Sequence, residues 1–216
     1  MGTTADKLQY LIDAKSSISA AIEAKGGTVP QELSGYGPAI EALPSGGSSD
    51  VAAKIVNRTV TEITATDLSG ATKIGYAAFQ KCTSLSSLII PDTVTEFDWG
   101  AFSECTKLSS VAIPNSVTKI GDSSFYNCSN ISSFIFGNGL TNIDIRAFRQ
   151  CTKCVIYDFS SATSVPTLAN VNAFQTTRAD KKIIVPDALY DQWKAANNWN
   201  SSTNGIVDAI TKASEA

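Results

Sequence analysis

Apolar residues recur at an interval of 23 positions along the middle of the chain, roughly from residue 55 to residue 190. Each regular unit carries one phenylalanine and, three positions later, one cysteine. These residues are Phe79, Phe102, Phe125 and Phe148, followed by Cys82, Cys105, Cys128 and Cys151. A period of this length predicts a solenoid, because each unit must bury its apolar face against the next one.

Irregular units flank the four regular ones. Residues 55–73 lack both the phenylalanine and the cysteine, which is typical of the capping unit of a solenoid. Residues 165–187 keep the sequence "NAF" but place Thr177 at the position of the cysteine. The following segment, residues 187–210, predicts a helix and a tail. It carries Trp193 and Trp199, two large side chains that would suit closing the open end of a stack.

The aligned units share the pattern I-G-x-x-A-F-x-x-C-x-x-L-x-x-L-x-I-P-x-x-V-T, which closely resembles the BspA-type leucine-rich repeat of bacterial surface proteins. The resemblance covers about residues 55–190 and implies a curved stack of coils. In that stack "LSSLII", "LSSVAI" and "ISSFIF" form a parallel sheet, "VTEF" and "VTKI" form short strands opposite, and "AFQKC" makes a turn of helix. Gly137 replaces the proline of the third unit and Cys154 replaces a leucine of the fourth, so we expect the last unit to be locally irregular.

The expected fold class is therefore mostly β with short helices. It is a leucine-rich-repeat solenoid with an N-terminal helical segment and a C-terminal helical cap. The N-terminal segment has its own pattern, because residues 4–24 place apolar side chains on one face at helical spacing, and "KGG" then ends the helix. The residues of this face that we expect to drive oligomerisation are Leu8, Leu11, Ile12, Ile18 and Ile22.

A single helix cannot bury such a face alone, so it packs on the rest of the chain, self-associates or docks on a partner. Residues 44–50, "PSGGSSD", have the composition of a flexible linker, which favours a separate module. The expected organisation is an attachment or oligomerisation module (1–43), the linker (44–50), the solenoid (51–190), and a cap with a tail (191–216). The N-terminal segment also resembles leader modules on tail and fibre proteins of phages that infect gut and Gram-positive bacteria.

The composition of the chain excludes several classes of partner. The 216 residues carry a net charge of -3 with a pI near 5.0 and no cluster of basic residues, which argues against binding to nucleic acid or to an anionic membrane. Histidine is absent, which removes the commonest general base and metal ligand. No apolar run is long enough to span a membrane, and the N-terminus lacks the regions of a secretory signal. We expect no cofactor.

The cysteines could be metal ligands, disulfide partners, redox-active thiols or packing residues. Only Cys151 and Cys154 have the C-x₂-C spacing of a metal site, and no second pair completes it. Disulfides between adjacent coils are conceivable from the distance between neighbouring strands. However, the thiols stand in one column and five cysteines leave one unpaired, so we interpret them as small hydrophobes of the core.

Outward-facing positions of the repeat are the remaining candidates for function. In L-x-x-L-x-I the x positions face solvent, which gives one column rich in serine and one that is mostly apolar. The candidate binding residues in these columns are Ser87, Ser110, Ser133, Ile89 and Ile135. A further column places Tyr76 and Trp99 on adjacent coils, where they either anchor a ligand or pack over the neighbouring coil.

We therefore expect a non-enzymatic recognition or structural protein. The leader resemblance favours a phage virion component, a tail or host-contact protein that contacts other virion proteins and binds a bacterial surface protein or glycan. One alternative is a BspA-type adhesin on the bacterial cell surface. Another is a glycan-active enzyme that uses surface acids such as Glu96, Asp98 and Glu104, which is less favoured because nothing places these acids in an apolar pocket.

Overall fold

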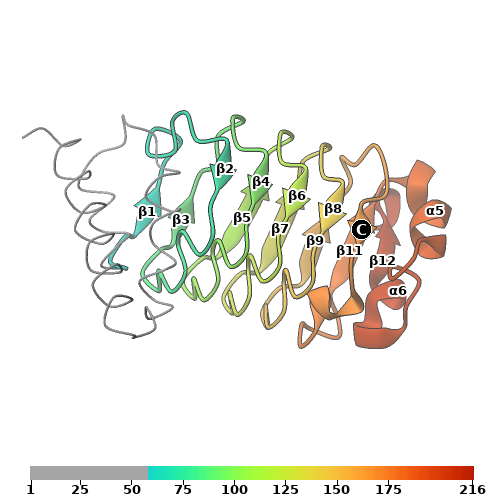
Figure 1. Cartoon of the computed structure of the whole chain (residues 1–216). Helices are drawn as coiled ribbons and strands as arrows, with labels where there is room; N and C mark the ends of the chain where they lie inside the picture. Colours follow the sequence, from blue (N-terminus) through green and yellow to red (C-terminus); the bar gives the residue numbers. More distant parts are fainter. Residues whose placement is uncertain (1–57) are drawn as a thin grey trace, which may run out of the picture.

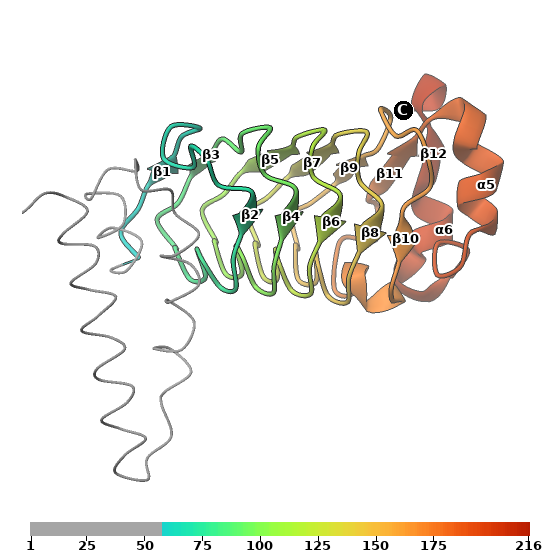
Figure 2. The same cartoon turned by 45° about the horizontal axis from the view of Figure 1, so that its top comes forward.

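The computed structural model describes residues 58–216, and the helix and linker expected within residues 1–57 lie outside this range. The described chain winds into coils that stack side by side (Figure 1). Each regular coil contributes a strand to each of two sides of the stack (Figure 2). The leucine-rich-repeat solenoid expected from the sequence is confirmed.

One side of the stack is a parallel five-stranded sheet of two-residue strands, called here the short-strand sheet. Its members are β2 (Lys73–Ile74), β4 (Glu96–Phe97), β6 (Lys119–Ile120), β8 (Asn142–Ile143) and β10 (Thr167–Leu168). The second residue of each strand is buried, whereas the first is more exposed. The strands expected at "VTEF" and "VTKI" are thus confirmed.

The opposite side carries longer strands. The long-strand sheet consists of β5 (Ser110–Ile113), β7 (Ser133–Phe136), β9 (Ile156–Asp158), β11 (Lys182–Val185) and β12 (Ile210–Lys212), all parallel to their neighbours. A separate pair on the same side joins β1 (Glu62–Ile63) to β3 (Ser87–Leu88). Inward and outward residues alternate along these strands, as a one-sided sheet requires.

The register of the strands explains why the end units look irregular in sequence. Lys73 pairs with Glu96, and Glu96 pairs with Lys119, each an offset of 23 positions. At the N-terminal end Glu62 pairs with Ser87, an offset of 25, and near the C-terminal end Ile156 pairs with Lys182, an offset of 26. The end units are therefore longer coils of the same stack.

Phenylalanine side chains fill the space between the two sides. Phe79, Phe102, Phe125 and Phe148 are all buried, and neighbouring rings are stacked with centroids 5.2, 5.3 and 6.2 Å apart along the column. Phe134 from β7 adds an edge-on ring 5.1 Å from Phe125. The fixed interval of 23 residues thus becomes a continuous aromatic core, since each coil places its ring against the same ring of the next coil.

The C-terminal end is closed by short helices and one additional strand. The elements are the 3₁₀ turns Asp187–Leu189, Thr203–Gly205 and Ala213–Glu215, and the helices α5 (Tyr190–Ala195) and α6 (Ile206–Ala209). Trp193 and Trp199 are buried against Phe159, and the indole N–H of Trp199 donates to the carbonyl of Pro166 at 2.7 Å. The helical cap is confirmed, but β12, which extends the long-strand sheet, was not expected.

The segment "AFQKC" is not a turn of helix, so that expectation is wrong. The N–H groups of Ala77, Phe79 and Lys81 donate to carbonyls of the next coil at 2.8, 2.8 and 2.7 Å. An α-helix would need these donors for bonds within the segment. The alternate N–H groups close tight turns instead, and Ala77 and Lys81 have positive φ angles of 52° and 60°. The only 3₁₀ turn at this position of a described coil is Val171–Phe174 in the irregular unit.

Gly100 offers a test of this left-handed backbone, because it stands at the position of Ala77 and has a φ of 62°. A Cβ at Gly100 would meet nothing closer than 3.8 Å, so space is available. We expect Gly100→Ala to lower the free energy of unfolding by about 1 kcal/mol through backbone strain alone. Gly100→Asn should cost less, because asparagine tolerates this conformation. Urea unfolding measures the stability of both variants. An unchanged midpoint for Gly100→Ala would contradict the left-handed backbone conformation at Gly100.

Candidate binding surface

The outward face of the long-strand sheet carries the serine and isoleucine columns. Ser110 lies opposite Ser133, and Ala112 lies opposite Ile135, in the register of β5 and β7. Ile135 is 53% exposed, and Ile89, which follows β3, is 55% exposed. Ser87 and Ser110 are exposed as well, whereas Ser133 is half-buried. The alternation expected from L-x-x-L-x-I therefore places these side chains on one outward face.

A shallow hollow of about 200 Å³ opens between β3 and β5 on this face. It is lined by Leu88, Ile89, Ile90, Ala112, Ile113 and Pro114. Ala112 is the smallest residue of the apolar column and stands between the coils of Ile89 and Ile135, so the column is indented at its centre. The sequence contained the signal for this indentation, a small residue between two large ones at the same repeat position.

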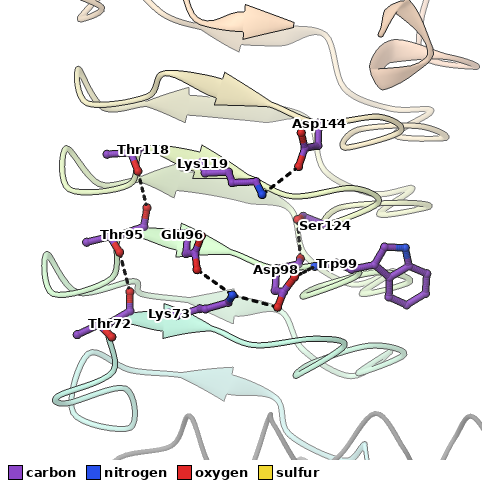
Figure 3. A network of polar contacts seen from close by, with 10 residues as sticks. All are labelled: Thr72, Lys73, Thr95, Glu96, Asp98, Trp99, Thr118, Lys119, Ser124 and Asp144. Carbon is purple, nitrogen blue, oxygen red and sulfur yellow. Dashed lines mark hydrogen bonds and ion pairs between the residues drawn. The ribbon is translucent and has the colours of Figure 1, made fainter. Parts of the chain in front are cut away.

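Tyr76 and Trp99 lie elsewhere, two residues after the ends of β2 and β4 of the short-strand sheet. Their rings are stacked with centroids 4.8 Å apart and an interplanar angle of 16°, and both residues are half-buried. Figure 3 shows the Trp99 side chain projecting away from the polar contacts beside it. The seven candidate residues therefore form two separate surfaces, one on each side of the stack (Figure 2).

A polar network holds the strands that precede this aromatic pair (Figure 3). Lys73 Nζ lies 2.8 Å from Glu96 Oε1 and 3.1 Å from Asp98 Oδ2, and these hydrogen-bonded carboxylates raise the pKa of Lys73. Asp98 Oδ1 also accepts the backbone N–H of Trp99 at 2.7 Å. The acids considered for catalysis thus bridge coils through a lysine, and Glu104 lies apart from them on the left-handed turn that precedes Cys105.

Threonines beside this network link successive coils in a second way (Figure 3). The hydroxyl of Thr95 donates to the carbonyl of Thr72, and that of Thr118 to the carbonyl of Thr95, at 3.0 and 3.2 Å. Thr141 continues the series at 3.0 Å. These threonines recur every 23 residues directly before β2, β4, β6 and β8, so the repeat itself indicated this series of hydroxyl bonds.

All five cysteines are buried, and three of them are hydrogen-bonded to the backbone of the neighbouring coil. The thiols of Cys105, Cys128 and Cys151 lie 3.1, 3.1 and 3.2 Å from the carbonyl oxygens of Phe79, Phe102 and Phe125. Burial raises the pKa of Cys82 and of Cys128 to about 12, so both thiols are protonated at neutral pH. Cys154 is also buried, and all five cysteines in the described residues are free. Within residues 58–216 no three side chains of His, Cys, Asp or Glu gather closely enough to hold a metal ion.

Comparison with known proteins places this geometry in a family. The model of the BspA-type leucine-rich repeat region matches residues 57–196 in six copies. The chain belongs to the BspA-type leucine-rich repeat family. No curated protein matches the sequence. None of the helices in the described range could cross a membrane, since each is too short or too polar.

Solved structures with similarity to this BspA-type chain are also leucine-rich repeat proteins. The T. pallidum leucine-rich repeat protein is 21% identical with a TM-score of 0.43, over 64% of this chain and 77% of that one. A Bacteroides ovatus leucine-rich repeat protein is 24% identical with a TM-score of 0.31, over 61% and 45%. A leucine-rich cell surface protein from Faecalibacterium prausnitzii is 22% identical with a TM-score of 0.29, over 59% and 37%.

The stacked pair of this BspA-type solenoid leads to a prediction about packing. Trp99→Ala removes a ring that lies 4.8 Å from the Tyr76 ring. We expect it to lower the free energy of unfolding by at least about 0.5–1.5 kcal/mol, the usual contribution of such a pair beyond area burial. Tyr76→Ala is the matched variant, and the double variant should lose less than the sum of both. Strict additivity in denaturant unfolding would show that the two rings do not stabilise each other.

Proposed function

We propose that this BspA-type solenoid is a non-enzymatic recognition protein. In this proposal it binds a bacterial cell-surface protein or glycan through the outward face formed by the serine and isoleucine columns. The observation that carries the proposal is the placement of exposed apolar groups. Three large hydrophobic residues are exposed among residues 58–216, and two of them, Ile89 and Ile135, stand in one column of this face.

Two physical features support this choice of face. Exposed isoleucines of one column lose unfavourable contact with water when a partner covers them. The hydroxyl groups of Ser87, Ser110 and Ser133 next to them can donate and accept hydrogen bonds at the rim of such a contact. The face therefore combines an apolar centre with a polar border, as protein interfaces do.

The test is retention of the purified full-length protein by envelopes of candidate host bacteria. Ile135→Asp should reduce retention about tenfold or more, because a carboxylate would have to be desolvated at the contact. Ile145→Asp is the matched control, because Ile145 is 41% exposed but lies beyond β8 of the short-strand sheet. Equal retention of Ile135→Asp and the unaltered protein would overturn the proposal.

The Tyr76–Trp99 pair is proposed as an accessory contact on the other side of the stack. Its support is the presence of two large half-buried aromatic rings on adjacent coils. Trp99→Ala should weaken retention by envelopes without unfolding the protein. Full retention by this variant would limit the role of the pair to packing.

We further propose that the protein is a virion component, a tail or host-contact protein attached to other virion proteins as a homo-oligomer through residues 1–43. The resemblance of the N-terminal segment to phage leader modules supports this proposal. The alternative is a bacterial cell-surface adhesin, which the family membership supports. Light scattering on the full chain and on a chain that begins at Asp50 tests the oligomer. Tail genes beside the coding sequence favour the virion, and cell-wall sorting genes favour the adhesin.

A further inference from the structure

Hydrogen bonding between coils is interrupted at one place in the long-strand side. β3 pairs with β1, and the five-stranded sheet begins at β5. Within the described range no hydrogen bond joins residues 86–90 to residues 109–114. The same two coils are joined on their other sides, where β2 pairs with β4 and Phe79 donates to the carbonyl of Ala101. The coils are therefore held together except along one edge.

The next pair of coils shows which bonds are missing. There the N–H groups of Ser132 and Gly137 donate to the carbonyls of Ser109 and Ile113, both at 2.8 Å. One coil earlier the position of Gly137 is occupied by Pro114, which has no N–H to donate. The N–H groups of Ser109 and Ala112, and the carbonyls of Ser86 and Leu88, have no partner within residues 58–216.

The hollow described above lies along this interruption, because its lining comes from residues 88–90 and 112–114. Its volume of about 200 Å³ is below the range of about 300–1,000 Å³ that small-molecule sites occupy. An engineered apolar cavity of about 150 Å³ holds a benzene ring, so this hollow matches one large apolar side chain. The outward residues beside it, Ser87, Ile89, Ser110 and Ala112, carry no charge, which disfavours a charged ligand.

We propose that the interruption between β3 and β5 binds an extended peptide segment of a protein partner. One apolar side chain of that segment enters the hollow. The main chain of the segment exchanges hydrogen bonds with the unpaired groups of Ser109, Ala112, Ser86 and Leu88. Recognition of this kind combines main-chain bonds for affinity with a pocket for an alternate side chain. The proposal rests on the recognition function proposed above and selects a protein rather than a glycan as its ligand.

Amide hydrogen exchange in the free protein is the first test. The amide of Ala112 should exchange much faster than the amide of Ile135, which occupies the same position one coil later within the paired sheet. Equal protection of both amides would show that β3 and β5 are joined in solution and would overturn the proposal.

Binding of a defined probe is the second test. The probe is a capped synthetic peptide in which threonine alternates with leucine and phenylalanine, with a lysine at each end. It should bind the full-length protein and slow exchange at Ser109 and Ala112. An analogue N-methylated at alternate amides should not bind, because its main-chain donors are blocked. Absence of binding by the first peptide, or equal binding by the analogue, would overturn the proposal.

A filled hollow provides the matched variant. Ala112→Phe places a ring in the hollow from its own wall and should weaken binding of the peptide about tenfold. Ile145→Phe adds a ring to an exposed position outside the hollow and should bind the peptide normally. If Ala112→Phe binds as tightly as the control, the hollow does not receive a side chain and the proposal fails.

Envelope retention separates this proposal from the broader one. Loss of retention in both Ile135→Asp and Ala112→Phe, with sensitivity to protease but not to periodate, supports both proposals. Loss of retention in Ile135→Asp alone supports the recognition face and overturns the peptide site. Loss after periodate oxidation of the envelopes assigns a glycan ligand and also overturns the peptide site.

Discussion

Phe125→Ala is expected to lower the free energy of unfolding by about 3–5 kcal/mol, the usual cost of truncating a buried phenylalanine. The Phe125 ring is fully buried and stacked between Phe102 and Phe148, with interplanar angles of 12° and 11°. Phe97 and Phe134 meet it edge-on at 5.8 and 5.1 Å. Truncation removes ring contacts from four directions and leaves a cavity inside the stack.

Two further variants make this prediction specific. Phe125→Leu keeps most of the apolar volume and should cost much less than Phe125→Ala, by the general tolerance of cores for similar volumes. Phe79→Ala should cost less than Phe125→Ala, because among the described rings Phe79 meets only Phe102. Denaturant unfolding monitored by circular dichroism gives all three values. A loss below about 1 kcal/mol for Phe125→Ala would contradict a continuous aromatic core.

Alkaline pH is expected to destabilise the fold strongly. Burial raises the pKa of Cys82 and Cys128 to about 12 and of Cys154 to about 11, and it raises the pKa of Cys105 and Cys151 well above the ordinary value. In the unfolded chain these thiols titrate near pH 8.5. Between the two pKa values the folded state holds more protons than the unfolded state, so stability falls as pH rises.

The magnitude follows from the same linkage. Stability should be nearly constant with respect to thiol titration below about pH 8 and should then fall by about 1.4 kcal/mol per pH unit for each buried thiol. Unfolding in urea at several values between pH 7 and pH 10 measures this slope. Cys105→Ala should lower stability at pH 7, because it loses the contact with the Phe79 carbonyl, but it should also reduce the slope by one thiol.

Cys105→Ser is the companion variant for function. Neither Cys105→Ala nor Cys105→Ser should change retention by bacterial envelopes, because the side chain is completely buried. An unchanged alkaline slope in Cys105→Ala would show that the pKa of this thiol is the same in the folded and unfolded states, and would contradict its role in the core.

The inward columns were predictable from the sequence because a repeat multiplies each weak signal. Phe102 alone says little, but a phenylalanine at the same place in four units implies stacking between coils. The helical turn at "AFQKC" was predicted wrongly for a physical reason. The spacing of Phe79 and Cys82 fits a helix as well as it fits a tight turn, and the donors from Ala77 and Lys81 to the next coil become visible only once the coils are stacked.

The candidate binding surface was also predictable only in part. Alternation along β5 and β7 predicted that Ser110 and Ile135 face outward, since strand periodicity fixes the direction of each side chain. The interruption between β3 and β5 could not be predicted from the repeat pattern. Pro91 and Pro114 occupy the same position of the repeat. The strand before Pro91, β3, nevertheless pairs with β1, so a proline at this position does not by itself indicate an interruption. The strand β12 was missed because its three residues carry too little pattern to be distinguished from the helical tail.

The burial of the cysteines determines which redox environments the protein tolerates. Oxidants and disulfides react with exposed thiolates, whereas a buried and protonated thiol is nearly inert. Cys82, Cys105, Cys128, Cys151 and Cys154 are all buried, and each stays reduced as long as its coil stays folded. The folded solenoid should therefore tolerate reducing and oxidising surroundings alike without a change in its covalent structure.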